Sequence, residues 1–175
     1  MADTYHSSQN EGKFDMACGF PIMPLKTKVS GPAPSCPEEE KDVIDEAIYY
    51  FRAMAFFKNF NPSGDADKVF VYVTCFISKL LEKVAENPEA ASKNVPLWLK
   101  EKFAMPSDKN FPLPFFVAKG YKPNELERFN KFAKQLRDEC ADRLLKILFH
   151  PEYGTMDLKF WLPYAKRKFL KVNFA

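Results

Sequence analysis

A run of apolar residues that would cover nearly every face of a helix is the feature that most constrains how this chain folds. It lies within residues 38–60, where the sequence predicts a helix that begins with the glutamates at 38–40, because carboxylates suit the positive end of a helix dipole. Only Asp45, Arg52 and Asn59 form a narrow polar stripe along it. A helix that is apolar all round must be surrounded by other elements. We therefore expect this helix to run through the centre of the domain.

Two aromatic residues, Tyr49 and Phe56, lie within the polar stripe and need a cover. The cover is either the N-terminal segment of the chain, which we expect, or a partner protein. Residues 1–37 have no sustained helical period and are broken by prolines, yet they are too apolar for a free tail. We expect an extended arm that lies over the helical body, residues 38–175, with disorder confined to about the first ten residues.

The segment 69–77 is ambiguous between a strand and a helix. Its β-branched and aromatic residues are typical of a strand. The segment 78–86, however, continues with ordinary helix-forming residues, and Asp65 is a suitable N-cap after the turn at 61–64. We therefore predict one helix of about twenty residues that starts from Asp65.

Prolines interrupt the segment 87–123 repeatedly. We predict short helical turns at 89–93 and 97–103 and an ordered surface loop over the remainder. Such a long connection without regular structure is more often than not functional. Its aromatic residues are the expected anchors: Trp98, Phe103, Phe111, Phe115 and Phe116.

The clearest helical pattern spans residues 124–149. Asn124 and Glu127 have the spacing of a capping box, and apolar residues recur on one face, with polar residues that include Gln135 opposite. A last helix, aromatic and basic, is predicted at 158–170, with Pro163 near its start or at a kink. The predicted fold class is all-α.

The sequence contains no arrangement of residues that indicates catalysis. It has two histidines, four widely spaced cysteines and none of the glycine-rich or serine motifs that bind phosphate or form a nucleophile. We therefore predict a protein that is not an enzyme and holds no cofactor or metal. We expect the cysteines to be free thiols in a reducing cytosol, and no run of about 18 apolar residues is present for a membrane span.

The C-terminal segment combines basic and aromatic residues. Three interpretations remain open: single-stranded nucleic acid binding, a docking surface for an acidic protein, or a solvated basic face at a helix end. The net charge of +3 is too small to indicate nucleic acid by itself. The basic residues are Lys159, Lys166, Arg167, Lys168 and Lys171, and the aromatic residues are Phe160, Trp161, Tyr164, Phe169 and Phe174.

Several motifs along the chain resemble those of the family of actin-related protein 2/3 complex subunit 3. The most specific is Asp45-Glu46-Ala47-Ile48-Tyr49-Tyr50-Phe51. The others are Tyr5-His6-Ser7-Ser8, Gly31-Pro32-Ala33-Pro34, Phe56-Phe57-Lys58-Asn59, Phe111-Pro112, Leu136-Arg137 with Arg143-Leu144, and Lys166-Arg167-Lys168-Phe169. The resemblance spans almost the whole chain.

The resemblance implies an all-α domain, residues 1–175, of about five helices with one enclosed by the others. It also implies a structural subunit of the seven-subunit complex that nucleates branched actin filaments. Such a subunit packs on one actin-related subunit, helps to clamp the second and contributes to contact with the mother filament. The implied location is the cytoplasm and the actin cytoskeleton, at cortical actin patches. The expected partners include no nucleic acid, membrane or small-molecule substrate.

Two sets of residues are the candidate partner contacts. Actin surfaces are acidic, so the basic residues Lys166, Arg167, Lys168 and Lys171 would form an actin-facing patch. Trp98 and Phe115, in the proline-broken segment, are the second set. The alternative is a stand-alone module that binds single-stranded nucleic acid through the basic aromatic C-terminus, or a peptide.

Overall fold

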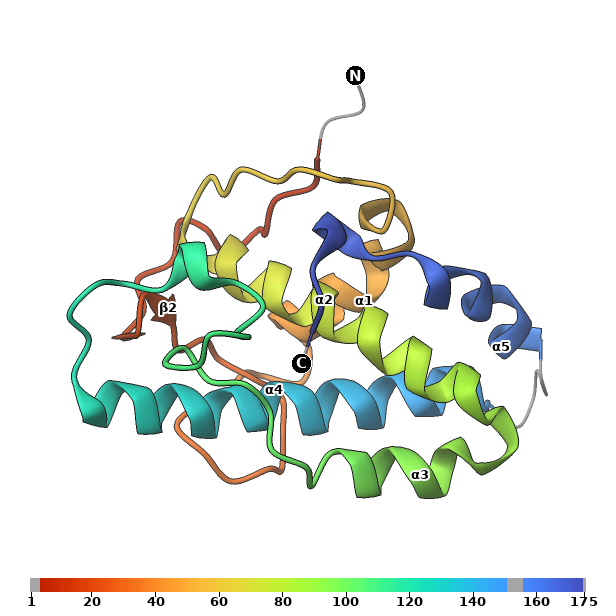
Figure 1. The fold of residues 1–175 in the computed structure, drawn as a ribbon. Coiled ribbons are helices and arrows are strands. Elements are labelled where there is room, and N and C mark those ends of the chain that lie inside the picture. Colours follow the sequence, from red (N-terminus) through yellow and green to blue (C-terminus); the bar gives the residue numbers. More distant parts are fainter. Residues whose placement is uncertain (1–3, 151–155, 175) are drawn as a thin grey trace.

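The computed structural model describes residues 4–150 and 156–174, and it is mostly helical (Figure 1). The described residues contain five α-helices, which confirms the predicted all-α class, with one antiparallel pair of two-residue strands. The α-helices are α1 (Val43–Met54), α2 (Asp65–Glu86), α3 (Ala91–Trp98), α4 (Pro123–Leu148) and α5 (Met156–Trp161). The strands are β1 (Met16–Ala17) and β2 (Phe20–Pro21), and the 3₁₀ turns are η1 (Pro88–Ala90), η2 (Pro114–Phe116), η3 (Leu162–Lys166) and η4 (Phe169–Lys171).

The central helix is α2, not the helix that contains the all-round apolar run. Between residues 66 and 81 of α2 every side chain is buried except Lys68 and Lys79, which are half-buried. Figure 1 shows α2 crossing the middle of the molecule, and it contacts α1, α3, α4 and the C-terminal 3₁₀ turns. The strand-like residues 69–77 are therefore the all-round apolar surface that an enclosed helix needs. The prediction that residues 38–60 form the centre was wrong, and the prediction of a helix at 65–86 is confirmed.

The start of α1 is set by Asp42 and not by the glutamates at 38–40. The Asp42 carboxylate accepts hydrogen bonds from the backbone N–H groups of Ile44 (3.1 Å) and Asp45 (3.0 Å), and the Asp45 carboxylate accepts one from the N–H of Asp42 (3.2 Å). This capping box satisfies N–H groups that the first turn of a helix leaves free. The helix is also shorter than predicted, because it ends at Met54.

The other predicted helix starts shift by one or two residues. Gly64 is the N-cap of α2, so Asp65 is the first helical residue. Pro123 opens α4, where its missing N–H is not needed, and Glu125 accepts a hydrogen bond from the N–H of Lys122 (2.8 Å). The predicted capping box of Asn124 and Glu127 is therefore wrong, although the extent of the helix is confirmed.

The N-terminal arm lies on the helical body as predicted. Its apolar side chains Ala17, Phe20, Ile22, Met23 and Leu25 are buried in the core. In the segment 87–122, α3 ends at Trp98, so the predicted helical turn at 97–103 was wrong. The four cysteines are free, and Cys36 alone among them is not buried.

Residues 4–10, which were expected to be disordered, are held by two buried carboxylates. Asp67 on α2 accepts a hydrogen bond from the N–H of Ser7 (2.7 Å) and lies 2.6 Å from His6 Nδ1. Glu46 on α1 accepts hydrogen bonds from the hydroxyls of Ser7 (2.7 Å) and Tyr5 (3.0 Å). The prediction failed because the partners lie on helices far along the chain, where no local pattern marks them.

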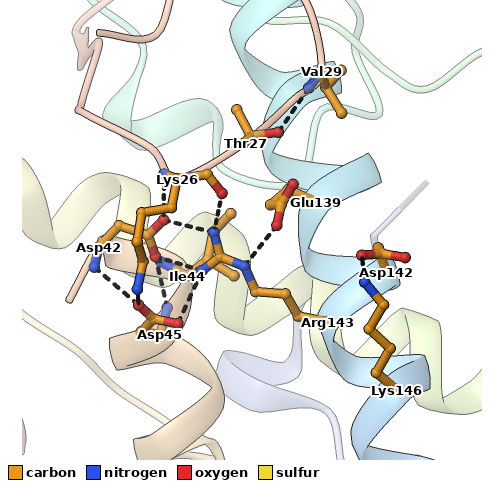
Figure 2. A network of polar contacts seen from close by, with 10 residues as sticks. All are labelled: Lys26, Thr27, Val29, Asp42, Ile44, Asp45, Glu139, Asp142, Arg143 and Lys146. Atoms are coloured by element: carbon orange, nitrogen blue, oxygen red, sulfur yellow. Dashed lines mark hydrogen bonds and ion pairs between the residues drawn. The ribbon is translucent and has the colours of Figure 1, made fainter. Parts of the chain in front are cut away.

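Two residues of α4 that belong to its polar pattern also hold the arm. Gln135 was expected to face solvent, but it is buried; its amide donates to the carbonyl of Val29 (2.8 Å) and accepts from the N–H of Ala33 (2.9 Å). The guanidinium of Arg143 donates to Asp42 (2.8 Å) and to the carbonyl of Lys26 (2.5 Å), as Figure 2 shows. The arm, α1 and α4 are therefore joined through side chains of α4.

Candidate interaction surface

The C-terminal segment is a series of short helical pieces and not the single helix predicted for 158–170. The α-helix α5 ends at Trp161, and the 3₁₀ turn η3 follows with Pro163 in its first turn. Proline lacks the N–H that an α-helix interior needs and its ring displaces the preceding turn. The alternative that Pro163 kinks the helix is therefore the one that the structure supports.

Buried aromatic side chains fix this segment to the helical body. Trp161 stacks on Phe51 of α1 with 5.8 Å between ring centroids, and Phe174 packs against Tyr72 (5.2 Å) and Phe76 (5.6 Å) of α2. Between these anchors the chain reverses at Leu170 and Lys171, whose φ angles of 53° and 57° lie in the left-handed region. That conformation costs roughly 1–2 kcal/mol per residue. The anchors on both sides hold the backbone there.

The four basic residues predicted as partner contacts, Lys166, Arg167, Lys168 and Lys171, are all exposed here, and we call them the basic turn. Lys166 ends η3, Arg167 and Lys168 connect it to η4, and Lys171 ends η4. The structure therefore brings these four together in space. No acidic residue occurs within the segment 158–174 to neutralise them.

The other two predicted contacts, Trp98 and Phe115, pack against different elements, and within the described part of the chain neither ring has a cation–π contact with the basic residues 166–171. Trp98 is half-buried and stacks on Phe76 of α2 with 5.7 Å between ring centroids and 4° between ring planes. Phe115 is 63% exposed on η2, where its neighbour Phe116 packs against Phe20 of β2 with 6.3 Å between ring centroids. The six predicted contact residues do not form one site.

The arm does not cover the aromatic residues of α1 that it was expected to cover. Tyr49 is 71% exposed and Phe56 is 56% exposed. Tyr5 of the arm stacks on Tyr50 instead, with 3.5 Å between ring centroids. Successive helical residues point about 100° apart, so a side chain that covers residue 50 leaves residue 49 uncovered. The prediction of an arm cover was wrong, and the alternative of a partner protein stays open.

One of these exposed rings, Phe56, adjoins the basic turn. The guanidinium of Arg167 lies 4.5 Å from the ring centroid of Phe56, and the guanidinium of Arg52 lies 4.2 Å from that of Phe160. Phe160, on α5, is 57% exposed. We call the surface formed by Tyr49, Arg52, Phe56, Phe160 and Arg167 the aromatic–arginine face.

Sequence reasoning did not include Arg52 and Phe160 among the contact residues. The signal for Arg52 was present, because Tyr49, Arg52 and Phe56 are spaced by three and then four residues and share one side of the helix. Phe160 was noted only as one aromatic residue of the basic C-terminal segment, since its position beside Arg52 depends on how α5 packs against α1. Only tertiary structure reveals that pair.

A charged groove of about 630 Å³ lies between the arm, α1 and α4. Three of its four basic groups are paired with acidic ones: Lys26 with Asp45 (2.6 Å), Arg143 with Glu139 (2.8 Å) and Lys146 with Asp142 (2.6 Å), all drawn in Figure 2. The fourth is Lys28, which is exposed. The groove therefore holds the chain together and presents little unpaired charge to a ligand.

Two other kinds of site find no support in the described part of the chain. No group of three or more His, Cys, Asp or Glu side chains is placed to hold a metal ion. None of the described helices is both long enough and apolar enough to cross a membrane. Of the four exposed aromatic side chains among the described residues, three lie on the aromatic–arginine face: Tyr49, Phe56 and Phe160.

Comparison with known proteins gives consistent matches over nearly the full length. The family model of P21-Arc, the ARP2/3 complex ARPC3 (21 kDa) subunit, matches residues 2–174. The "Actin-related protein 2/3 complex subunit 3" of Arabidopsis thaliana is 36% identical over 171 residues, which are 96% of this chain and 97% of the relative. The protein of the same name from Dictyostelium discoideum is 35% identical over 95% of this chain and 97% of its own length. That from Schizosaccharomyces pombe is 37% identical over 85% and 86%, respectively.

Proposed function

This chain belongs to the family of ARPC3 (21 kDa) subunits of the ARP2/3 complex, and we propose from that membership that it is a structural subunit of the complex, which nucleates branched actin filaments. The observation that carries the proposal is the match over residues 2–174, together with relatives that align over nearly their full length. A fragmentary match would support only a shared module.

The subunit acts by contact and not by catalysis, and it is associated with the actin cytoskeleton. Within the cell we place it in the cytoplasm at cortical actin patches. It packs on an actin-related subunit, helps to hold the second one and contributes to contact with the mother filament. The names of its relatives, which are subunits of the same complex, support this role.

The basic turn is the part of the surface that we assign to actin. Lys166, Arg167, Lys168 and Lys171 are exposed and lie in a segment without acidic residues. Charged groups of this kind steer association and set its salt dependence more than they set affinity. Trp98 and Phe115 are assigned as separate contacts, and the exposure of Phe115 favours it over Trp98.

The experiment that tests the function is replacement of the native subunit by a tagged copy of this chain, followed by gel filtration of the native extract. The tagged chain should elute far above its own 20.2 kDa and should co-purify with the actin-related subunits. The purified assembly should form filament branches. Elution as a lone 20.2 kDa protein would contradict the proposal. The alternative of a stand-alone nucleic acid or peptide module finds no support in the comparisons.

A further inference from the structure

The arginines of this chain divide into two groups by what they bind. Three donate hydrogen bonds to other residues of this chain. Arg128 donates to Asp15 (3.0 Å), Arg137 to the Tyr72 hydroxyl (2.8 Å) and Arg143 to Asp42 (2.8 Å). The remaining two are Arg52 and Arg167. Both lie on the aromatic–arginine face.

Neither Arg52 nor Arg167 has a hydrogen-bond or ion-pair partner for its guanidinium among the described residues. Each instead lies over an exposed aromatic ring, Phe160 for Arg52 and Phe56 for Arg167. Stacking uses the face of the guanidinium and leaves the N–H groups at its edge free to donate. It also restricts the side chain before any partner arrives, which lowers the entropy lost on binding.

The stretches of chain that carry the five residues of this face contain no acidic residue, although Asp157 directly precedes the second stretch in sequence. Residues 47–62 and 158–174 contain no aspartate or glutamate. The nearest acidic side chain on α1 in sequence is Glu46, which is buried and bound to the arm. The face therefore combines positive charge with three exposed aromatic rings and has no internal counter-ion within these segments.

We propose that the aromatic–arginine face is a permanent docking surface for an acidic patch on another subunit of the complex, with carboxylates of that subunit bound at the edges of Arg52 and Arg167. The proposal rests on the proposed function and adds to it the chemistry of one partner. Carboxylates match the paired N–H groups of a guanidinium, and the exposed rings supply apolar area around those bonds.

The composition of the face favours a protein partner that stays bound. Tyrosine, phenylalanine and arginine are enriched at the centres of protein interfaces and lysine is depleted there. The five residues of the face include no lysine, although Lys41 lies at its edge with Nζ 5.2 Å from the ring centroid of Tyr49. Three aromatic rings that are each more than half exposed would be unfavourable in water if the partner left between cycles. A neighbouring subunit keeps them covered, whereas a mother filament does not.

The test is equilibrium binding of the full-length chain to the remainder of the complex, purified from cells that lack this chain. Arg52→Glu combined with Phe160→Ala removes one stacked pair without touching the basic turn. Tyr49→Ser is a second variant at the most exposed ring, and Arg128→Glu on α4 makes the same charge change outside the face. Circular dichroism and thermal unfolding check that each variant is folded.

We expect the double variant to bind at least about thirtyfold more weakly and Tyr49→Ser to bind several-fold more weakly, with Arg128→Glu close to the unaltered chain. Affinity of the unaltered chain should fall with added salt, and less so for the double variant. Unaltered binding by the folded double variant would overturn the proposal. Normal assembly with loss of binding to filaments, or to vesicles of anionic lipid, would also overturn it by giving the face a different partner. Failure of the unaltered chain to bind would instead refute the proposed function.

Discussion

Arg143 joins three parts of the chain that are distant in sequence (Figure 2). Its guanidinium donates to Asp42 at the start of α1, to Glu139 on its own helix and to a carbonyl of the arm. The Asp42 side chain is fully buried and that of Arg143 is 15% exposed. A buried carboxylate of this kind is stable only while its donors remain.

Replacement of Arg143 by alanine should therefore lower the free energy of unfolding by about 3 kcal/mol, because Asp42 would remain buried without its cation. Urea unfolding followed by circular dichroism measures the change. Lys146→Ala is the matched control, since Lys146 is 74% exposed in its pair with Asp142 and should change stability by less than about 0.5 kcal/mol. Equal effects of the two substitutions would show that the Arg143 network is not structural.

Acid should destabilise the fold through two buried carboxylates. Burial alone would raise the pKa of Asp42, but hydrogen bonds from Arg143 lower it below the usual 3.8. At Asp67, too, burial alone would raise the pKa, but hydrogen bonds from the N–H of Ser7 and from His6 lower it below the usual value. A pKa that is lower in the folded state contributes stability above the unfolded value, and this contribution is lost as pH falls through the folded value.

We expect the free energy of unfolding to be steady near neutral pH and to fall steeply below about pH 4. Urea unfolding at a series of pH values, from neutral to below about pH 4, measures this free energy. The variant Asp67→Asn should start less stable and lose less on acidification, because one of the two titrating groups is gone. A steeper acid loss in Asp67→Asn than in the unaltered chain would contradict this assignment.

Charge reversal of the basic turn tests its assignment to actin. The triple variant Lys166→Glu, Arg167→Glu and Lys168→Glu should fold normally, because all three side chains are exposed, but assembly or branching should weaken. Branching rates by fluorescence microscopy and the yield of complex measure the two effects. Reversal of the exposed lysines Lys28, Lys119 and Lys122 is the control. Normal branching by the folded triple variant would remove the basic turn from the proposed function.

At the scale of elements, the sequence predicted which segments are helical better than it predicted which helix is central. Periodicity located α2 and α4, because a long buried face repeats at helical spacing. It identified the wrong helix as the central one, because the sequence pattern is the same whether an apolar residue is covered by this chain or by a partner protein. Tyr49 and Phe56 made α1 look enclosed, yet both are exposed on this chain. For the same reason the sequence did not reveal the aromatic–arginine face, since aromatic residues that face a partner and aromatic residues of the core are of the same types.

The segment 87–122 shows the distinction between core and contact residues most directly. Trp98→Ala should cost about 2–3 kcal/mol of stability, because its ring stacks on Phe76 and packs on Phe103 (5.2 Å). Phe115→Ala should change stability by less than about 0.5 kcal/mol, since most of its side chain is in water. Thermal unfolding separates the two.

Binding of the Phe115→Ala variant to the remainder of the complex then decides whether Phe115 is a contact. Weaker binding at unchanged stability supports the assignment. Unchanged binding leaves Phe115 as an exposed residue without a role in assembly. Large destabilisation by Phe115→Ala would show that the ring is packed in solution and would contradict its 63% exposure.

For the whole molecule, we propose that residues 1–175 are one domain in which the arm is as much a part of the fold as the helices. The arm contributes buried apolar residues, and its first residues satisfy the carboxylates of Glu46 and Asp67. The arm was predictable from its apolar content. Its attachment was not, because each contact pairs a short polar motif with a helix more than thirty residues away.

Deletion of residues 1–10 should therefore destabilise the entire domain and not only its edge. The deletion removes the donors to Glu46 from the arm, leaves Asp67 with Ser63 as a donor but without Ser7 and His6, and uncovers Tyr50. We therefore expect a loss of about 3 kcal/mol. Helix content by circular dichroism and tryptophan fluorescence should still report one coincident, earlier transition. The variant Glu11→Ala/Lys13→Ala, at exposed positions, should unfold like the unaltered chain. Two separate transitions, or no loss on deletion, would mean that the arm and the helical body do not form one cooperative unit.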